Sequence, residues 1–182
     1  MPATMGTLYR YTLILIACAA LLVGIQIPNF VDQYEKRLDA HLSEVKNNLQ
    51  GYQDIADRLY GGSIAALIAK HQQSDDEAFK QEAGPIANIF QRYEHFSKEL
   101  AALLATGLTG KIAYIITQGD GELIAETYNN YSFAVPLNET AVVAGFIFMG
   151  VVVFVIEALR VAIARLFHPG RRKSEQPERP MP

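Results

Sequence analysis

Two long uncharged stretches lie near the ends of the chain, and a charged segment separates them. Residues 12–27 and 140–156 contain no charged side chain. Each stretch approaches the roughly 20 apolar residues that a helix needs to cross a ~30 Å hydrocarbon layer, and flanking apolar residues complete it. The pattern predicts two transmembrane helices, over residues 8–27 and 138–160.

Between these stretches the apolar positions recur every three or four residues. After Val31 the recurring apolar side chains are Tyr34, Leu38, Leu42, Val45, Leu49, Tyr52, Ala56 and Leu59. This spacing is typical of a helix with one narrow apolar face, as in a coiled coil. Because such a face must be covered, the pattern also predicts a partner helix.

A second periodic segment supplies that partner. Its apolar side chains are Phe79, Ile86, Ile89, Tyr93, Phe96, Leu100 and Leu103. Ser74 and Glu77 have the spacing of a capping box, so we expect the helix to start at Ser74, and Pro85 to bend it or start it afresh. Two long segments of the same period predict an antiparallel helical hairpin.

Shorter signals mark the connections. Gly61 and Gly62 end the first long helix, and Ser63 is expected to cap a short helix over residues 64–71. Residues 111–117 fit either a strand or a helix, and we favour helix. A further short helix is expected after the turn at residues 118–122.

Two signals mark the junctions with the predicted spans. Pro28 is expected to begin the exterior helix where the first span ends, because proline is tolerated in a first helical turn. Asn138 is expected to cap the second span.

These elements predict an all-α membrane protein with two transmembrane helices bracketing an extracytoplasmic helical hairpin or bundle. The expected segments are a cytoplasmic N-terminus (1–7), transmembrane helix 1 (8–27), an extracytoplasmic helical domain (28–137), transmembrane helix 2 (138–160) and a basic cytoplasmic tail (161–182). The composition of residues 168–182 is typical of disorder.

Charge sets the expected orientation. Residues 28–139 contain nine Lys or Arg and sixteen Asp or Glu, whereas Arg10, Arg160, Arg165 and residues 171–173 place positive charge beside the spans. Because positive charge favours the cytoplasmic side, both termini are expected in the cytoplasm. An acidic middle domain gives no indication of nucleic-acid binding, and the expected partners are the lipid bilayer and a protein, or a second copy of the chain.

Cys18 is the only cysteine, so no internal disulfide is possible. The sequence "LIAC" at residues 15–18 matches the pattern at which bacterial lipoproteins are cleaved and lipidated. However, the apolar run continues to residue 27 instead of stopping there. We therefore expect Cys18 to be unmodified and the first span to be retained.

Four histidines, His41, His71, His95 and His168, are the candidates for metal ligands. Only two pairs share a helix face, His95 with Glu99 and His41 with Glu44, and both fit a solvated surface equally well. The Gly-Asp-Gly at residues 119–121 is expected to be a plain turn. No catalytic, cofactor-binding or metal-binding residue is therefore predicted, and no small-molecule ligand is indicated.

Polar and small residues within the spans suggest helix contacts. Glu157 and Arg160 share a helix face, where they can pair near the cytoplasmic edge. Ala20 and Gly24 have the spacing that lets another helix approach closely.

Three segments of the chain resemble an uncharacterised family of bacterial inner-membrane proteins, a domain of unknown function. They are "QIPNFVDQYEKRL" after the first span, which carries a Q-x-P-x-F-x-x-Q-Y pattern, "GYQDIA" at residues 51–56, and "YSFAVPLNETA" before the second span. The similarity extends from about residue 13 to residue 165, although a tryptophan expected near Tyr128 is absent. It implies a location in the bacterial inner membrane with a periplasmic middle domain, and it supplies no catalytic residue.

Two functions are consistent with these features. The first is a non-enzymatic inner-membrane protein that binds a partner, as an assembly or accessory factor, through its periplasmic helical domain. The second is a sensor-like input module that passes a signal through its membrane helices to another protein, because the fifteen residues after Phe167 are too few for an output domain.

Overall fold

The computed structural model describes residues 2–134 and 138–167, and all the regular structure among them is helical. The helices are α1 (Pro2–Leu59), α2 (Ile64–Gln72), α3 (Glu77–Leu104), α4 (Leu108–Gln118), α5 (Gly121–Asn129) and α6 (Glu139–Phe167). The segment for which a strand was the alternative is helix α4. The chain forms two compact units: a two-helix unit of Met1–Gln26 and Val135–Pro182, and a helical domain of Ile27–Ala134.

Helix α1 passes through Pro28 without a break, so the expectation that Pro28 begins a new helix is wrong. A proline inside a helix cannot donate to the carbonyl four residues earlier, here that of Gly24, and costs about 3 kcal/mol. Packing on both sides of the proline offsets this cost, because Ile25 and Val31 are both buried. The start of the helical domain is therefore not a helix end.

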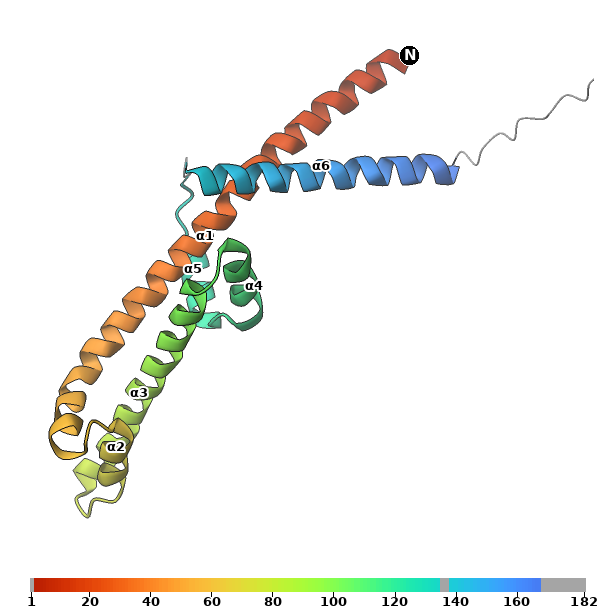
Figure 1. Cartoon of the computed structure of the whole chain (residues 1–182). Helices are drawn as coiled ribbons and strands as arrows, with labels where there is room; N and C mark the ends of the chain where they lie inside the picture. Colours follow the sequence, from red (N-terminus) through yellow and green to blue (C-terminus); the bar gives the residue numbers. More distant parts are fainter. Residues whose placement is uncertain (1, 135–137, 168–182) are drawn as a thin grey trace, which may run out of the picture. The chain divides into compact units, whose positions relative to one another are not determined.

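The periodic face of α1 is buried along most of its length, as predicted. Its buried members are Tyr34, Leu38, Val45, Leu49 and Ala56, and those of α3 include Ile86, Phe96 and Leu103. Figure 1 shows α3 alongside the orange part of α1, with α2 where the two helices are joined. Leu59 and Phe79, at the ends of the two periodic segments, are instead exposed.

The α1–α3 pairing is antiparallel and contains two apolar clusters. In the first, Val45 packs with Phe96. In the second, Leu49 and Ala56 pack with Ile86 and with Leu67 of α2. The two helices therefore run in opposite directions, as expected for helices joined by a short connection.

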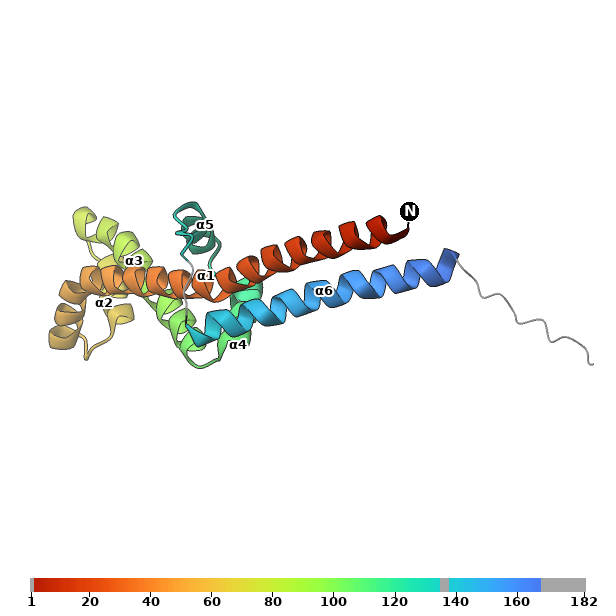
Figure 2. The ribbon, with the colours of Figure 1, turned by 90° about the horizontal axis from the view of Figure 1, so that it is seen from above.

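Helices α4 and α5 complete the first cluster with Ile115 and Leu123. They lie to either side of α1 in Figure 2. An ion pair accompanies each contact: Lys111 Nζ lies 2.6 Å from Glu35 Oε1, and Arg37 Nη1 lies 2.9 Å from Glu126 Oε1.

The connection between α1 and α2 follows its sequence signals. Gly61 and Gly62 adopt positive φ angles of 59° and 85°, which glycine accepts without a steric penalty. Ser63 caps α2, since its Oγ accepts the Ala66 N–H at 3.1 Å.

The start of α3 differs from the expected capping box. Asp76, not Ser74, is the N-cap, and its carboxylate accepts the Ala78 N–H at 2.8 Å. Ser74 Oγ instead accepts the Asp76 N–H at 3.2 Å, which orients the capping residue. Helix α3 also continues through Pro85 without starting afresh. The carbonyl that Pro85 leaves unbonded belongs to Gln81, an exposed residue, so water can satisfy it.

In the two-helix unit, α1 and α6 approach closely at two glycines. A Cβ at Gly24 would lie 2.8 Å from Gly145 Cα and 2.7 Å from Phe148 Cβ, so only glycine fits there. This confirms the expected close approach at Gly24. Asn138 caps α6 as predicted, because its Oδ1 accepts the Ala141 N–H at 2.8 Å.

A polar contact joins the same two helices farther along. Tyr9 donates to Glu157 Oε1 at 2.6 Å, and Glu157 Oε2 lies 2.9 Å from Arg160 Nη2, which confirms the expected Glu157–Arg160 pair. Helix α6 continues to Phe167, so residues 161–167 are helical, while the rest of the expected tail lies outside the described residues.

Both α1 and α6 are long and apolar enough to cross a membrane. Only 6% of the most apolar stretch of α6 is buried, whereas a core helix of a soluble protein is mostly buried. The exposed side chains of α6 include Phe146, Ile147, Val151, Phe154, Val155 and Leu159. A continuous apolar surface of this kind marks contact with lipid or with another protein.

The α1–α3 packing predicts the effect of a charge at Leu49. Replacing this buried leucine with Asp places an unpaired carboxylate in an apolar cluster and should cost several kcal/mol, a large share of the roughly 5–15 kcal/mol that stabilises a typical domain. Thermal unfolding and protease resistance of the purified protein measure the loss.

Asn48→Asp is the matched control, because Asn48 immediately precedes Leu49 in the same helix and is exposed. It should change stability by no more than about 0.5 kcal/mol. Equal stability of the two variants would mean that the buried face of α1 is assigned wrongly.

Candidate functional site

A buried polar core joins α1, α3 and α5 inside the helical domain. It consists of Tyr34, Glu99 and Asp120, and the exposed His95 borders it. Glu99 is 1% exposed, although charged residues are almost never fully buried unless paired. Tyr34 donates its hydroxyl proton to Glu99 Oε1, and the Asp120 backbone N–H donates to Tyr34 Oη at 2.9 Å.

Asp120 links this core to the first turn of α5. Its Oδ1 accepts the N–H groups of Glu122 and Leu123 at 2.9 and 3.0 Å, which makes it the N-cap. Its Oδ2 lies 3.1 Å from His95 Nε2. The Gly-Asp-Gly segment is thus a turn, as expected, and it also fixes the start of α5 to α1 and α3.

Burial and hydrogen bonding set the protonation states of the core. Burial raises the pKa of the Tyr34 phenol well above its ordinary value, and the bond to Glu99 raises it further, so Tyr34 stays a proton donor. Burial alone would raise the pKa of the Asp120 carboxyl. The Leu123 N–H, His95 and the Glu122 N–H outweigh burial and hold that pKa below its ordinary value, so Asp120 is an anion at neutral pH.

One atom of the polar core lacks a hydrogen bond. Glu99 Oε2 is buried with no hydrogen-bond partner among the described residues, and His95 Nε2 lies 3.6 Å from it. Leaving a buried acceptor unsatisfied costs about 1–3 kcal/mol. The polar core therefore holds α5 in position, while the unsatisfied Glu99 oxygen lowers the stability of the domain.

A second polar group holds α5 against α1. Glu126 Oε2 lies 2.8 Å from His41 Nε2, and its Oε1 accepts from Arg37. The bond to His41 lowers the pKa of the Glu126 carboxyl, partial burial opposes this, and Arg37 adds to the lowering. His41 lies farther from its expected partner Glu44, at 3.9 Å.

A hydrogen-bonded clasp ties the segment after α5 to the start of the domain. It comprises Asn29 and Gln33 of α1 with Tyr131, Ser132 and Ala134. Gln33 donates to the Ser132 carbonyl at 3.0 Å and accepts the Ser132 N–H at 3.2 Å. Asn29 donates to Tyr131 Oη at 2.9 Å and to the Ser132 carbonyl at 3.2 Å. The returning chain is therefore held beside α1.

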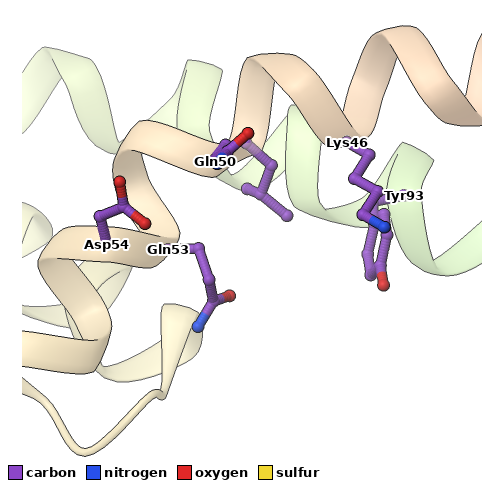
Figure 3. A pocket seen from close by; sticks show the side chains of 6 residues that line it. Lys46, Gln50, Gln53, Asp54 and Tyr93 are labelled. Carbon is purple, nitrogen blue, oxygen red and sulfur yellow. The ribbon is translucent and has the colours of Figure 1, made fainter.

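A groove of about 320 Å³ lies between α1 and α3. Lys46, Leu49, Gln50, Gln53 and Asp54 of α1 and Tyr93 of α3 line it. In Figure 3 Lys46 and Tyr93 lie toward one end of the groove, while Gln53 and Asp54 lie toward the other. The groove thus combines an aromatic side chain with amide groups and one charge of each sign.

The candidate metal pairs are not part of a larger group of possible ligands. Among residues 2–134 and 138–167, no three His, Cys, Asp or Glu side chains are grouped so that they could hold a metal ion. His71 accompanies Glu82 at 3.7 Å, and His168 lies outside the described residues. That the chain has no catalytic, cofactor or metal residues stays a prediction.

One residue in the sequence, Glu99, indicated the polar core, although an analysis of apolar periodicity does not detect it. Glu99 lies three residues after Phe96 and four before Leu103, so it occupies the buried face of α3. A charged residue at such a position indicates a buried pair. Its partners, Tyr34 and Asp120, are distant in sequence and carried no signal of their own.

Comparison with known proteins assigns the chain to a family. The model of the family described as "Protein of unknown function (DUF2937)" matches residues 8–169. The chain belongs to this family. This agrees with the resemblance to an uncharacterised family found in the sequence. No curated protein and no solved structure matches the chain.

Family membership covers both compact units, since the matched residues include α2 to α6 and nearly all of α1. The two-helix unit and the helical domain therefore belong to one shared sequence pattern. The family description assigns no activity.

The polar core predicts a measurable role for the Tyr34 hydroxyl. Tyr34→Phe keeps the ring but removes the donor to Glu99 and the acceptor for the Asp120 N–H. We expect a loss of about 1–3 kcal/mol, because buried polar groups lose their partners. Thermal unfolding followed by circular dichroism measures it.

Tyr114→Phe is the control, since Tyr114 packs against the same apolar cluster but takes no part in the bonds of the polar core. It should unfold close to the wild-type temperature. If both variants lose the same stability, the polar core does not depend on Tyr34.

Proposed function

We propose that the protein is a non-enzymatic inner-membrane protein of bacteria that binds a protein partner through an extracytoplasmic helical domain. In this proposal α6 and the N-terminal part of α1 cross the membrane, both termini lie in the cytoplasm, and residues 27–134 lie in the periplasm. The groove between α1 and α3 is the observation that carries the partner-binding role.

The groove has the features of a protein-contact site. Tyr93 is half-buried, and rigid aromatic side chains of this kind are frequent anchors at protein interfaces. Lys46 and Asp54 offer opposite charges along one helix, which favours a partner segment of complementary charge in one orientation. The volume of the groove, about 320 Å³, is at the small end of the ~300–1,000 Å³ that is typical of small-molecule pockets.

Charge and exposure support the membrane arrangement. The acidic middle segment and the basic residues beside the spans follow the charge bias of periplasmic and cytoplasmic flanks. The uncovered apolar side chains of α6 fit a lipid environment.

One observation favours a sensor-like input module as the second candidate. Helix α1 is continuous from its apolar N-terminal part to Leu59, and it carries both Tyr34 of the polar core and the groove residues. A continuous helix of this kind can transmit a change in the domain to a protein that contacts the membrane helices.

The proposed topology makes a direct prediction. Alkaline phosphatase fused after Lys70 should be active, because that enzyme folds only outside the cytoplasm, and a fluorescent protein fused after residue 182 should fluoresce. An inactive phosphatase fusion alongside a stable, full-length product would overturn the orientation.

The partner-binding role predicts a position-specific crosslink. A photoreactive amino acid in place of Gln50, in the groove, should give one adduct of defined mass when cells are irradiated. The same residue in place of Asn48 should give none, because Asn48 is exposed on a different face of α1.

Each outcome of the crosslinking experiment has a meaning. An adduct of twice the chain mass would identify the partner as a second copy. Equal adducts at both positions, or none at either, would contradict a binding role for the groove.

A further inference from the structure

The clasp presents one aromatic side chain to its surroundings. Phe133 is 84% exposed, although its position is fixed. Its ring packs edge-on against Tyr131 with 4.9 Å between centroids, and Tyr131 in turn lies 5.9 Å from the Phe30 ring. Gln33 holds the neighbouring Ser132 through two hydrogen bonds. This ring is held in place but left uncovered within its own domain, so it is available for a contact outside the domain.

We propose that Phe133, supported by Tyr131 and Phe30, inserts into the headgroup layer of the lipid bilayer and anchors the helical domain to the membrane surface. The partner is the lipid interface, not a protein. The inference goes beyond partner binding and rests only on the membrane-spanning part of the proposed function.

The position of Phe133 along the axis of α1 supports this assignment. Its neighbours Ser132 and Ala134 are bonded to Gln33 and Asn29, which lie six and two residues beyond residue 27, where the first span is proposed to end. At 1.5 Å per residue, Phe133 lies about 3–9 Å beyond that end. The headgroup layer on each side of a bilayer is about 5–8 Å thick, since a core of ~30 Å lies within a total of ~40–45 Å. The two ranges overlap.

The chemistry of the neighbourhood also suits the interface. Aromatic rings concentrate at the boundary between hydrocarbon and water. The first charged residues of α1 beyond residue 27 are Asp32, Glu35 and Lys36. Asp32 pairs with Lys36 and Glu35 pairs with Lys111, both at 2.6 Å, so these charges are balanced.

The absence of tryptophan from the chain allows a direct test. Full-length Phe133→Trp is reconstituted into phosphatidylcholine vesicles whose acyl chains carry bromine either near the headgroup or near the bilayer centre. We expect a blue-shifted emission, and a larger loss of fluorescence with the shallow bromines than with the deep ones.

Two further single-tryptophan variants make the result unambiguous. Phe154→Trp, at an exposed position in α6, should be quenched most by the deep bromines. Phe79→Trp, at an exposed position near the start of α3, should not be quenched. Within the helical domain, Leu59 lies about 40 Å along α1 from Gln33, which holds Ser132, so Phe79 lies at the end of the domain away from Phe133.

The outcomes separate the anchor from the proposed function. If the Phe133→Trp variant behaves like Phe79→Trp while Phe154→Trp is quenched, the lipid anchor is wrong and the membrane spans remain. If deep bromines quench the Phe133→Trp variant most, the new indole lies inside the hydrocarbon and the anchor is again wrong. If the Phe154→Trp variant is not quenched, the membrane-spanning arrangement itself fails.

Discussion

The structure depends on a single constraint, the narrow apolar face of α1. A helix that is apolar on one stripe and polar elsewhere is not stable by itself in water, because propensity alone contributes too little. In the helical domain this stripe is covered first by α3 and then, at the end nearer residue 27, by α4 and α5. Each covering helix also makes a polar contact to α1: Glu99 of α3 to Tyr34, Lys111 of α4 to Glu35, and Glu126 of α5 to Arg37. Apolar burial provides the stability, and the polar contacts determine where each helix attaches.

The sequence predicted the features that depend on local pattern. The 3–4 periodicity located the buried positions of α1 and α3, and glycine and serine located the turn before α2, because these signals act within a few residues. The errors arise where a local signal is overridden or has a competitor. Pro28 was expected to begin a helix, but α1 is continuous there, with Ile25 and Val31 buried on either side, and α3 continues through Pro85 without starting afresh. Ser74 was expected to be the cap, whereas Asp76 competes for the same role two residues later.

The candidate site was much less predictable. The pairing of Tyr34 with Glu99 spans 65 residues, and the clasp between Gln33 and Ser132 spans 99. No periodic pattern encodes contacts of this length, since they follow from how the helices pack and not from the identity of their neighbours in sequence. Only Glu99 gave a signal, as a charged residue on an apolar face. The groove beside Tyr93 gave none, because its polar lining looks like ordinary helix surface.

The sequence pattern that follows the first apolar stretch now has a physical role. In the pattern at residues 26–34, Phe30 lies beside the Tyr131 ring, Gln33 holds Ser132, and Tyr34 binds Glu99. About one turn of α1 therefore attaches two separate parts of the chain, the returning segment and the α3–α5 core. Tyr131 and Ser132 open the last of the three resembling segments, so two sequence patterns about a hundred residues apart meet in one contact. These residues therefore determine how the helical domain closes on itself, because they hold its first helix to its last segment and to its polar core.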